Sequence, residues 1–393
     1  MLLLKLAIRN ITHAGIRTWL NVLVLSVAFV SIVVTEGLYD GISEQVRHTE
    51  INTNIGGGQY WQKDYDPLNP FSYDMAHSVI PAHLNDQIKI GNATPQLIIP
   101  ATIYPRKMIQ TILIKGINPD QQILMLSTNL LNDNKDTLSI PAFIGPRMAE
   151  SSGLKEGDVV TVKWRNVNHT FDAADIRIVK VLELISPLID KDQIWIPFER
   201  LNTMIQTFNH ATIIVVKKNA GIIPATNKEW IFKDENTLLK DIIENINRKK
   251  IYSSFVYIIL IGMALLAVFD TQVLSIFKRK KEMGTLMALG MIKTNVVCLI
   301  TLEGCITGLL SFVACSIYGI PLLTYLANNG IELPRMVQQS QFALGLIFYP
   351  KYGIGLYFLT AIILFISVII VSYLPARKIT KLNPNDALKG KMK

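Results

Sequence analysis

The chain has 393 residues, 50% of them hydrophobic, and a formal net charge of +9 at pH 7. Its mean hydropathy of +0.32 argues against a wholly soluble protein. A pI near 9.3 would suit a nucleic-acid-binding protein, but the basic residues flank apolar segments instead of forming one patch. We therefore expect a membrane protein without a nucleic-acid partner.

Four segments are long and apolar enough to span a bilayer, which takes roughly 20 residues of helix. Their apolar centres carry no charged residue apart from Glu303 in the third segment. The third segment is also long enough to tilt or to extend beyond the bilayer. The predicted transmembrane helices are residues 17–38, 251–277, 294–327 and 352–374.

Basic residues gather at one end of these predicted helices. They number 14 against the acidic Glu282 and Asp386, a sum of +12, so the remainder of the +9 chain carries −3. The positive-inside rule then places both termini in the cytosol and residues 39–250 outside. The basic residues are Lys5, Arg9, Arg17, Lys278, Arg279, Lys280, Lys281, Lys293, Arg377, Lys378, Lys381, Lys389, Lys391 and Lys393.

The first span could instead belong to a cleaved signal peptide. Its 17-residue leader is long for that role, and no small-residue cleavage site follows the apolar run. We therefore expect an uncleaved span. Residues 1–16 before it are predicted to form an interfacial amphipathic helix, with Leu4, Ala7, Ile8 and Ile11 on one face. A plain cytosolic helix is the alternative.

The segments that follow the first span and precede the second continue a helical period. Glycines at 56–58 are expected to end the first of these extensions. Two spans that extend outward as amphipathic helices would form a stalk, which can transmit movement across the membrane. The apolar stalk positions are Leu38, Ile42, Val46, Leu239, Ile242, Ile243 and Ile246.

Between the stalk helices, short β-rich segments alternate with turn signals, which indicates a large extracytoplasmic α+β domain. Helices are expected at 146–152 and 198–207, and 64–85 is expected to be an ordered loop with a short helix. The predicted strands are 96–104, 111–117, 159–164, 176–185, 193–197 and 212–217.

A short charged connector, residues 278–293, joins the second and third spans. Its basic run alone would fit a simple topological anchor. An anchor would not need Glu282, Gly284 and Gly290, so we expect a soluble partner to grip the connector, with Met283, Leu286 and Leu289 as the apolar face. The predicted coupling residues are Arg279, Lys281, Glu282, Met283, Gly284, Leu286, Leu289 and Gly290.

Residues 328–351 are expected to form a short outer loop, and residues 375–393 a cytosolic tail. Pro375-Ala376-Arg377 should close the fourth span. A small helix is predicted after it, because Asn383 suits the N-cap, Pro384 the first helical position and Asp386 the contact back to the cap.

Motifs for chemistry are missing from the sequence. It contains no Gly-x-x-x-x-Gly-Lys-Ser/Thr loop for ATP phosphates and no His-Glu-x-x-His, Cys-x-x-Cys or Gly-x-Ser-x-Gly motif. His77 and His83 are interpreted as surface histidines, and we expect no catalytic residue, metal or cofactor. Glu36, Asp270 and Glu303 raise the alternative of a proton relay, but their shallow positions favour hydration or pairing with Lys or Arg.

Four places in the chain resemble ABC-transporter permeases of the FtsX, MacB and LolC/LolE type. The segment from Leu6 to Ile11, followed by Arg17-Thr18, resembles the family's opening. Glu303-Gly304 resembles an acidic-small pair in its third span, and Pro375-Ala376-Arg377 with Asn383 to Leu388 resembles its closing motif. The connector resembles the family pattern at Arg279, Glu282, Met283, Gly284, Ala288 and Gly290.

This resemblance implies a permease subunit of the inner (cytoplasmic) membrane that is not itself an enzyme. A second permease protomer would complete a homo- or heterodimer, and each protomer would bind a separate ABC ATPase subunit through the connector. ATP-driven closure of the ATPases would move the stalks and outer domains, a process called mechanotransmission. Asp270 departs from the family, where an asparagine is commoner at this place.

Two outer-domain fragments, Ile114 to Pro119 and Ala149 to Asp158, resemble the lipoprotein-release branch and also have relatives among MacB-like permeases. We therefore expect release of a lipoprotein or export of another amphipathic substrate, in contact with membrane lipids. The alternatives are an FtsX-like signalling permease that regulates a cell-wall hydrolase, and MacB-like efflux of peptides or antibiotics. The sequence leaves open the cargo and any docking partner in the periplasm or outer membrane.

Overall fold

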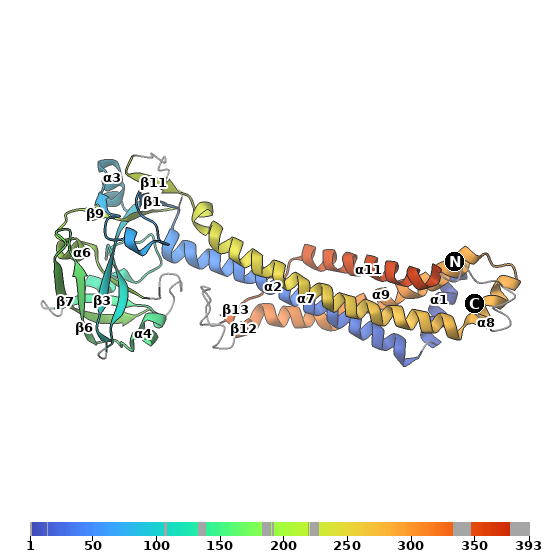
Figure 1. The fold of residues 1–393 in the computed structure, drawn as a ribbon. Coiled ribbons are helices and arrows are strands. Elements are labelled where there is room, and N and C mark those ends of the chain that lie inside the picture. The colour runs from blue at the N-terminus through green and yellow to red at the C-terminus, as the bar shows by residue number, and fades with distance from the viewer. Residues whose placement is uncertain are drawn as a thin grey trace. The chain divides into compact units, whose positions relative to one another are not determined.

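The computed structural model describes residues 2–13, 15–105, 108–132, 139–182, 190, 192–218, 220, 228–332 and 347–377, without the side chains of residues 2–4, 12, 13 and 17. Four of its helices are long and apolar enough to cross a membrane (Figure 1). They are α2 (Ile16–Glu50), α7 (Glu235–Lys278), α9 (Lys293–Asn329) and α11 (Ile354–Arg377). An α+β domain lies between the first and second of these helices in the chain, which confirms the predicted fold class.

The chain divides into two compact units, and each is described by itself. Residues 1–42, 245–332 and 348–393 belong to a helical unit, and residues 43–244 and 333–347 belong to an α+β unit. The α7 helix has 44 residues and so is about 66 Å long, against about 30 Å for a bilayer core. Helix α7 is therefore longer than a bilayer crossing requires. So is α2, which has 35 residues and passes into a π-helical turn, Ile51–Ile55, before Gly56.

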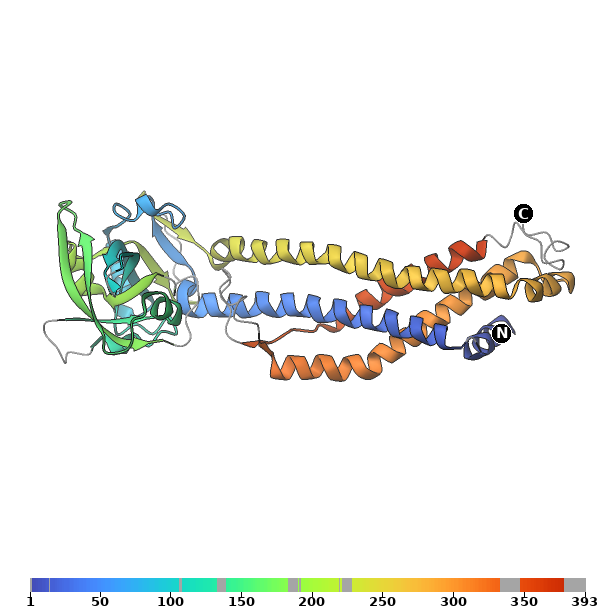
Figure 2. The same cartoon turned by 60° about the horizontal axis from the view of Figure 1, so that its bottom comes forward.

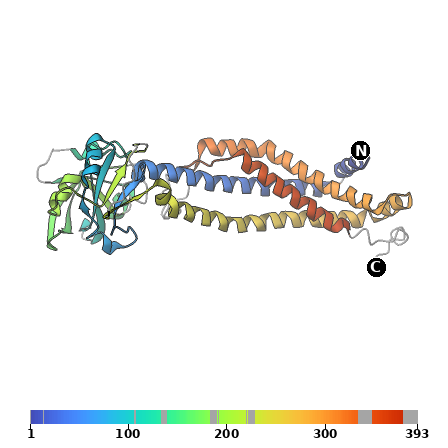
Figure 3. The same ribbon diagram turned by 90° about the horizontal axis from the view of Figure 1, so that it is seen from above.

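Apolar side chains from all four long helices form the core of the helical unit. Phe29 of α2, Val268 of α7, Cys315 of α9 and Leu364 of α11 belong to one buried cluster. The central apolar windows of α2 and α9 are each 50% buried, against 17% for α7 and 11% for α11. Most of the surface that this unit can offer to lipid therefore comes from α7 and α11, whose paths can be followed in Figures 2 and 3.

The N-terminal helix α1 (Leu2–His13) packs against α9 at the connector end of the helical unit (Figure 1). Ala7 and Ile11 are buried, and Lys5 and Arg9 are exposed, so the predicted amphipathic helix is confirmed. Ile8 is 48% exposed and does not share the buried face as expected. One turn of helix separates Ala7 from Ile11, so the two buried side chains share a face of α1.

A nine-stranded sheet forms the core of the α+β unit, in the order β11-β1-β10-β3-β4-β8-β5-β7-β6. An additional pairing of β3 with β6 closes the strands from β3 to β6 into a barrel. Neighbours are antiparallel except β4 with β8 and β5 with β7. The strands are β1 (Gln59–Gln62), β3 (Ala93–Ile103), β4 (Gln110–Ile117), β5 (Ile140–Ile144), β6 (Val159–Arg165), β7 (Phe171–Val181), β8 (Gln193–Pro197), β10 (Ile213–Val216) and β11 (Trp230–Lys233).

The alternation of side chains explains the barrel. In β6, Val160, Val162 and Trp164 point inward while their neighbours are exposed, as a strand with one buried face requires. In the described residues of this unit, the helices α3 (Ala82–Ile90), α4 (Pro146–Ser152) and α6 (Phe198–Met204) accompany the sheet. Strand β2 (Ser78–Val79) also pairs with β9 (His210–Ala211). Between α9 and α11 in the chain, β12 (Ile331–Glu332) pairs with β13 (Ile347–Phe348).

Several predicted elements differ from the structure in extent. The helix at 146–152 and the strand at 193–197 coincide with α4 and β8, whereas β7 begins at Phe171, before the predicted 176. The predicted loop at 64–85 contains a 3-10 turn, Pro70–Ser72, and the start of α3. Strands β1, β5 and β11 were not predicted, because each is short and takes its burial from sheet neighbours distant in the chain.

The end of the fourth span also differs from the predicted boundary at residue 374. Helix α11 continues through Pro375 to Arg377, because a proline removes only one helical hydrogen bond this close to the helix end. The helix therefore runs past the predicted boundary at 374 and ends at Arg377, the last residue of the Pro375-Ala376-Arg377 motif. The predicted tail helix at 383–388, the tail lysines, and residues 333–346 of the outer loop lie outside the described residues.

Candidate functional site

The connector between α7 and α9 forms a short helix of its own. Arg279 leaves the helical path of α7 with φ −99° and ψ 16°, and α8 then runs over Lys280–Ala288. Gly290 turns the chain with a φ of +96°, a value that favours glycine, and α9 follows at Lys293. Arg279 and Gly290 therefore set the two ends of α8.

The predicted coupling residues divide between the surface and the core of the connector. Met283 is 4% exposed and packs among Ile276 of α7, Val296 of α9 and Ala376 of α11, so it attaches α8 to the helical unit. The apolar face predicted for a partner is thereby reduced to Leu286 and Leu289. Of the remaining coupling residues, Gly284 is buried, Leu286 is half-buried, and Lys281, Glu282, Leu289 and Gly290 are exposed.

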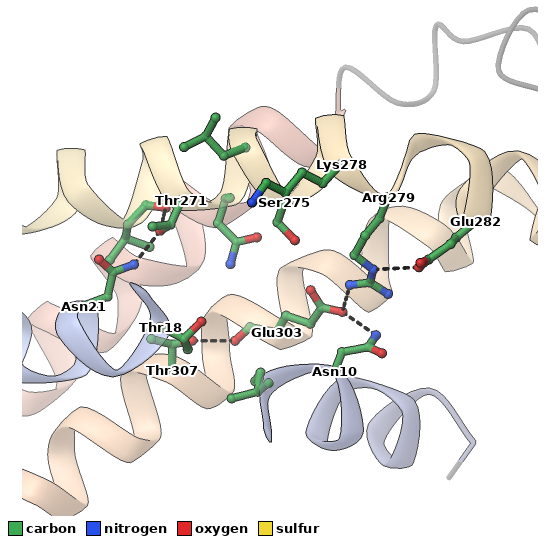
Figure 4. Close-up of a pocket in the computed structure, with 14 residues that line it drawn as sticks. Asn10, Thr18, Asn21, Thr271, Ser275, Lys278, Arg279, Glu282, Glu303 and Thr307 are labelled. Atoms are coloured by element: carbon green, nitrogen blue, oxygen red, sulfur yellow. Dashed lines mark hydrogen bonds and ion pairs between the residues drawn. The ribbon is translucent and has the colours of Figure 1, made fainter. Parts of the chain in front are cut away.

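The Arg279 guanidinium joins the connector to α9. Its Nε donates to Glu282 Oε2 at 3.0 Å, and its Nη1 donates to Glu303 Oε1 at 2.8 Å (Figure 4). The side chain of Glu282 is 67% exposed and that of Glu303 only 8%. Arg279 was expected to contact a partner, but it turns inward and connects the surface of α8 with a buried carboxylate.

Glu303 also holds the N-terminal helix. Asn10 Nδ2 of α1 donates to the same Glu303 Oε1 at 2.7 Å, so α1, the connector and α9 meet at one oxygen. A buried carboxylate requires such partners, because its charge is costly to remove from water. The expected pairing of Glu303 with a basic residue is confirmed, whereas Asp270 is exposed on α7.

A cavity of about 450 Å³ lies beside the Arg279–Glu303 ion pair (Figure 4). The Asn21 amide of α2 donates to the Thr271 hydroxyl of α7 at its wall, and the Thr307 hydroxyl donates to the Glu303 carbonyl at 3.0 Å. Other lining residues come from the α1, α2 and α7 helices and from the start of the connector: Ile11, Thr18, Val268, Gln272, Leu274, Ser275 and Lys278.

The predicted stalk residues are not exposed in either helix. Val46, Leu239 and Ile246 are buried, and Leu38, Ile42, Ile242 and Ile243 are half-buried. In the helical unit, Lys250 of α7 joins α2: its Nζ lies 2.9 Å from Glu36 Oε2 and 2.7 Å from Asp40 Oδ1. The pairing expected for Glu36 is therefore present, whereas the sequence analysis missed the parts of Lys250 and Asp40. The signal for this cluster was the pair of acidic residues four positions apart in α2.

The segment before α11 rests on α2. The Lys351 amide donates to the Gly37 carbonyl at 2.9 Å. A Cβ atom at Gly41 would lie 2.3 Å from the Tyr349 carbonyl oxygen, so only glycine permits this approach. The spacing of two small residues four positions apart in a spanning helix could have predicted the contact.

In the α+β unit, His77 is half-buried and faces His210, with 3.0 Å between their Nδ1 atoms. It is therefore not the surface histidine that was expected, and burial lowers the pKa of both imidazoles. Asp74, which pairs with Arg165 at 3.0 Å, lines a cavity of about 270 Å³ together with His77. No group of three or more His, Cys, Asp or Glu residues in the described part of the chain is arranged to hold a metal ion.

The sequence of the helical unit identifies its type. Residues 254–384 match the family model described as FtsX-like permease C-terminal. This part of the chain is an FtsX-like permease domain. The domain includes α8, α9 and α11, and hence Arg279, Glu303 and the packing of Met283.

Other comparisons add little to this assignment. No curated protein matches the sequence. The extracellular domain of the noncanonic ABC-type transporter YknZ from Gram-positive bacteria is similar with 13% identity, over 42% of this chain and 84% of that one, at a TM-score of 0.27. The periplasmic region of MacB from Actinobacillus actinomycetemcomitans is similar with 12% identity, over 49% and 94%, at a TM-score of 0.31.

Proposed function

We propose that the chain is the permease subunit of an ATP-driven ABC transporter that works by mechanotransmission. The FtsX-like permease domain supports this function. A separate ATPase subunit would supply the energy, as the resemblance to ABC-transporter permeases implies. Two permease protomers, identical or different, would lie in the inner membrane with both termini in the cytosol and the α+β unit in the periplasm.

The bridge from Glu282 through Arg279 to Glu303 carries this proposal. A partner that pulls on Glu282, Lys281 or Leu289 at the surface of α8 also moves Arg279, and through it α9 and α1. Separating Arg279 from Glu303 would leave a buried carboxylate without its charged partner, which is unfavourable. The connector would therefore move together with the helical unit instead of yielding at its base.

The substrate would be handled on the periplasmic side. Helices α2 and α7 each extend beyond the bilayer, so a displacement at their membrane segments can reach the chain outside without passage of a substrate. We propose release of a lipoprotein or export of another amphipathic molecule as the work done there. The resemblance of residues 114–119 and 149–158 to the lipoprotein-release branch supports this choice.

Two substitutions on α8 test the coupling between the connector and the ATPase. With the cognate ATPase co-expressed, Glu282→Lys and Gly284→Pro should leave membrane insertion intact and abolish the substrate-stimulated part of ATP hydrolysis. The matched control is Glu244→Lys, a charge reversal at an exposed carboxylate of α7, outside the connector. With this variant the ATPase should hydrolyse ATP as it does with the unmodified protein. Stimulated hydrolysis at the normal rate in both α8 variants would refute the coupling role.

Photo-crosslinking tests the substrate class. A crosslinker at Leu38 or Ile243 should capture a lipoprotein if the stalk handles amphipathic cargo. Capture of a soluble cell-wall hydrolase on the α+β unit, with no lipoprotein on the stalk, would instead favour a signalling permease.

A further inference from the structure

Residues 74–79 of the α+β unit form a strap between two buried anchors. Tyr73 before the strap is 7% exposed and Ile80 after it is 4% exposed, whereas within the strap only Ala76 is buried. Apolar burial therefore fixes the two ends of the strap but little of its middle. The middle depends on polar contacts and on the short pairing of β2 with β9.

The strap contributes to the wall of the cavity of about 270 Å³ in this unit. The lining includes Ile99 of β3 and Ile205, which both belong to the hydrophobic core. Displacement of the strap would therefore open the cavity and bring water to core residues. Strand β6 and the turn after it supply four further lining residues: Arg165, Asn166, Val167 and His169. The strap itself supplies Asp74, Met75 and His77.

Two side-chain contacts link the strap to its surroundings. Asp74 pairs with Arg165 of β6 at 3.0 Å, but the side chains are 36% and 39% exposed, and exposed ion pairs contribute little. His77 meets His210 of β9 with 3.0 Å between their Nδ1 atoms, and both residues are half-buried. The ring centroids are 5.2 Å apart, so each Nδ1 lies close to the line that joins the two rings. Each nitrogen therefore directs its hydrogen or its lone pair at the other.

The chemistry of imidazole makes this hydrogen bond sensitive to protonation. A neutral ring carries a proton on one nitrogen and a lone pair on the other, so one Nδ1 donates and the other accepts. One added proton leaves the bond intact, because it can enter at Nε2 of the donor ring. A second proton occupies the accepting Nδ1, and two N–H groups with two positive charges then face each other. The bond is therefore lost when both rings are protonated.

The groups around the pair place this loss on the acid side. Burial lowers the pKa of His77 most, His210 lowers it further, and Asp74 raises it. For His210, burial lowers the pKa. Arg165 is paired with Asp74, and His169 lines the same cavity but is exposed. Because both pKa values lie below the ordinary 6.5, the bond persists at neutral pH.

We propose that the hydrogen bond between His77 and His210 is an acid-sensitive latch that holds residues 74–79 against the cavity. At neutral pH the latch is closed. When both imidazoles are protonated, the strap separates from β9 and the cavity opens between the anchors Tyr73 and Ile80. The separation breaks the pairing of β2 with β9, which spans only two residue pairs. This device goes beyond the proposed function, which assigns no role to pH.

Hydrogen exchange at two pH values tests the latch. The full-length permease in detergent, without its ATPase, exchanges at pH 7.5 and at pH 4.5. Protection factors use the intrinsic exchange rate at each pH, so the pH dependence of the exchange chemistry cancels. The amides of residues 77–80 should lose at least tenfold in protection at pH 4.5, relative to those of β4. Equal relative protection at both pH values would overturn the proposal. ATPase coupling plays no part in this measurement, so it succeeds or fails independently of the proposed function.

Substitutions identify the titrating groups. The side-chain amide of His77→Asn places a donor and an acceptor near the position of Nδ1 and does not titrate, so protection should stay high at both pH values. His77→Phe keeps a ring without nitrogen, and its protection should already be low at pH 7.5. His169→Asn, at the same cavity, is the matched control and should keep the full pH dependence.

Two results with these variants would contradict the latch. One is an undiminished loss of protection at pH 4.5 in both His77→Asn and His210→Asn. The other is a pH dependence that disappears in His169→Asn, which would assign the effect to a different histidine. The unmodified protein decides the first test by itself, so the proposal stays falsifiable even if a variant does not fold.

Discussion

The Arg279 guanidinium and the Glu303 carboxylate meet at 2.8 Å, although 24 positions separate them in the chain. Arg279 is the first residue after α7, and Glu303 lies about three turns into α9. The same arginine reaches Glu282 on the exposed side of α8. The ion pair therefore fixes the direction in which the connector leaves the helical unit.

Glu303→Gln should loosen this attachment. The amide keeps the hydrogen bond to Asn10 but removes the negative charge that Arg279 faces. We expect the free energy of unfolding of the helical unit to fall by about 2 kcal/mol, the usual size of a hydrogen bond to a charged group. Thermal unfolding in detergent measures this. Substrate-stimulated ATP hydrolysis with the partner ATPase should fall in parallel.

The control for that variant is Glu282→Gln, which removes the exposed half of the same bridge. An exposed ion pair contributes less than about 1 kcal/mol, so its unfolding should be nearly unchanged. If the two variants lost equal stability, Glu303 would not be the anchor of the connector.

Gly41→Val should displace the segment before α11 from α2. The new side chain would meet the Tyr349 carbonyl oxygen and the Pro350 Cα at 2.3 and 2.9 Å from its Cβ. Overpacking of this kind costs about 1–3 kcal/mol in unfolding free energy. Gly262→Val in α7 is the matched control, since no atom lies within 4 Å of a Cβ there. Valine has a higher helix propensity than glycine, so a similar loss of unfolding free energy in both variants would mean that the contact with the segment before α11 is not the cause.

Lys250→Gln should separate α2 from α7 where Glu36 and Asp40 approach the lysine. Loss of the cation leaves two carboxylates facing each other without their partner. A double-mutant cycle with Asp40→Asn should give a coupling energy of about 1 kcal/mol. Lys249→Gln, one position earlier, serves as control. A coupling energy near zero for Lys250 would show that the cluster is only a surface contact.

Stability of the α+β unit should depend on pH through Lys115. Burial lowers the pKa of this lysine to about 8, against a weaker opposing effect of Glu50, and its Nζ lies 4.8 Å from the centre of the Trp195 ring. Between pH 8 and 10.5 the unfolded chain binds more protons here than the folded one, so the free energy of unfolding should rise with pH, by up to about 3 kcal/mol.

Lys115→Met should remove this rise. Denaturant unfolding of both proteins across pH 7 to 10.5, followed by tryptophan fluorescence, measures the difference in slope. Other titrating groups are common to both proteins and cancel. Parallel pH profiles would show that Lys115 keeps its ordinary pKa in the folded state.

The long helices could be predicted from local pattern, because hydrophobic length and a period of 3.6 residues belong to each segment alone. The strand β8 and helix α4 were also predicted from local residues, β8 as a β-rich segment between turn signals and α4 as a segment that begins with proline. Strands β1, β5 and β11 could not be, since their burial comes from neighbours that the sheet order supplies. The sequence also could not predict which connector residues are exposed. A helical period shows which residues share a face, but not that Met283 packs among three other helices.

The sequence by itself determined that this chain crosses a membrane four times, has an α+β domain after the first span, and carries a charged connector after the second. Bilayer thickness and residue polarity are enough for these conclusions. Only the tertiary structure decided which charges meet. Arg279 faces Glu303, and Lys250 faces Glu36 and Asp40, because helix crossings bring together side chains that are distant in the chain. The position of Gln272 at the wall of a polar cavity was decided in the same way.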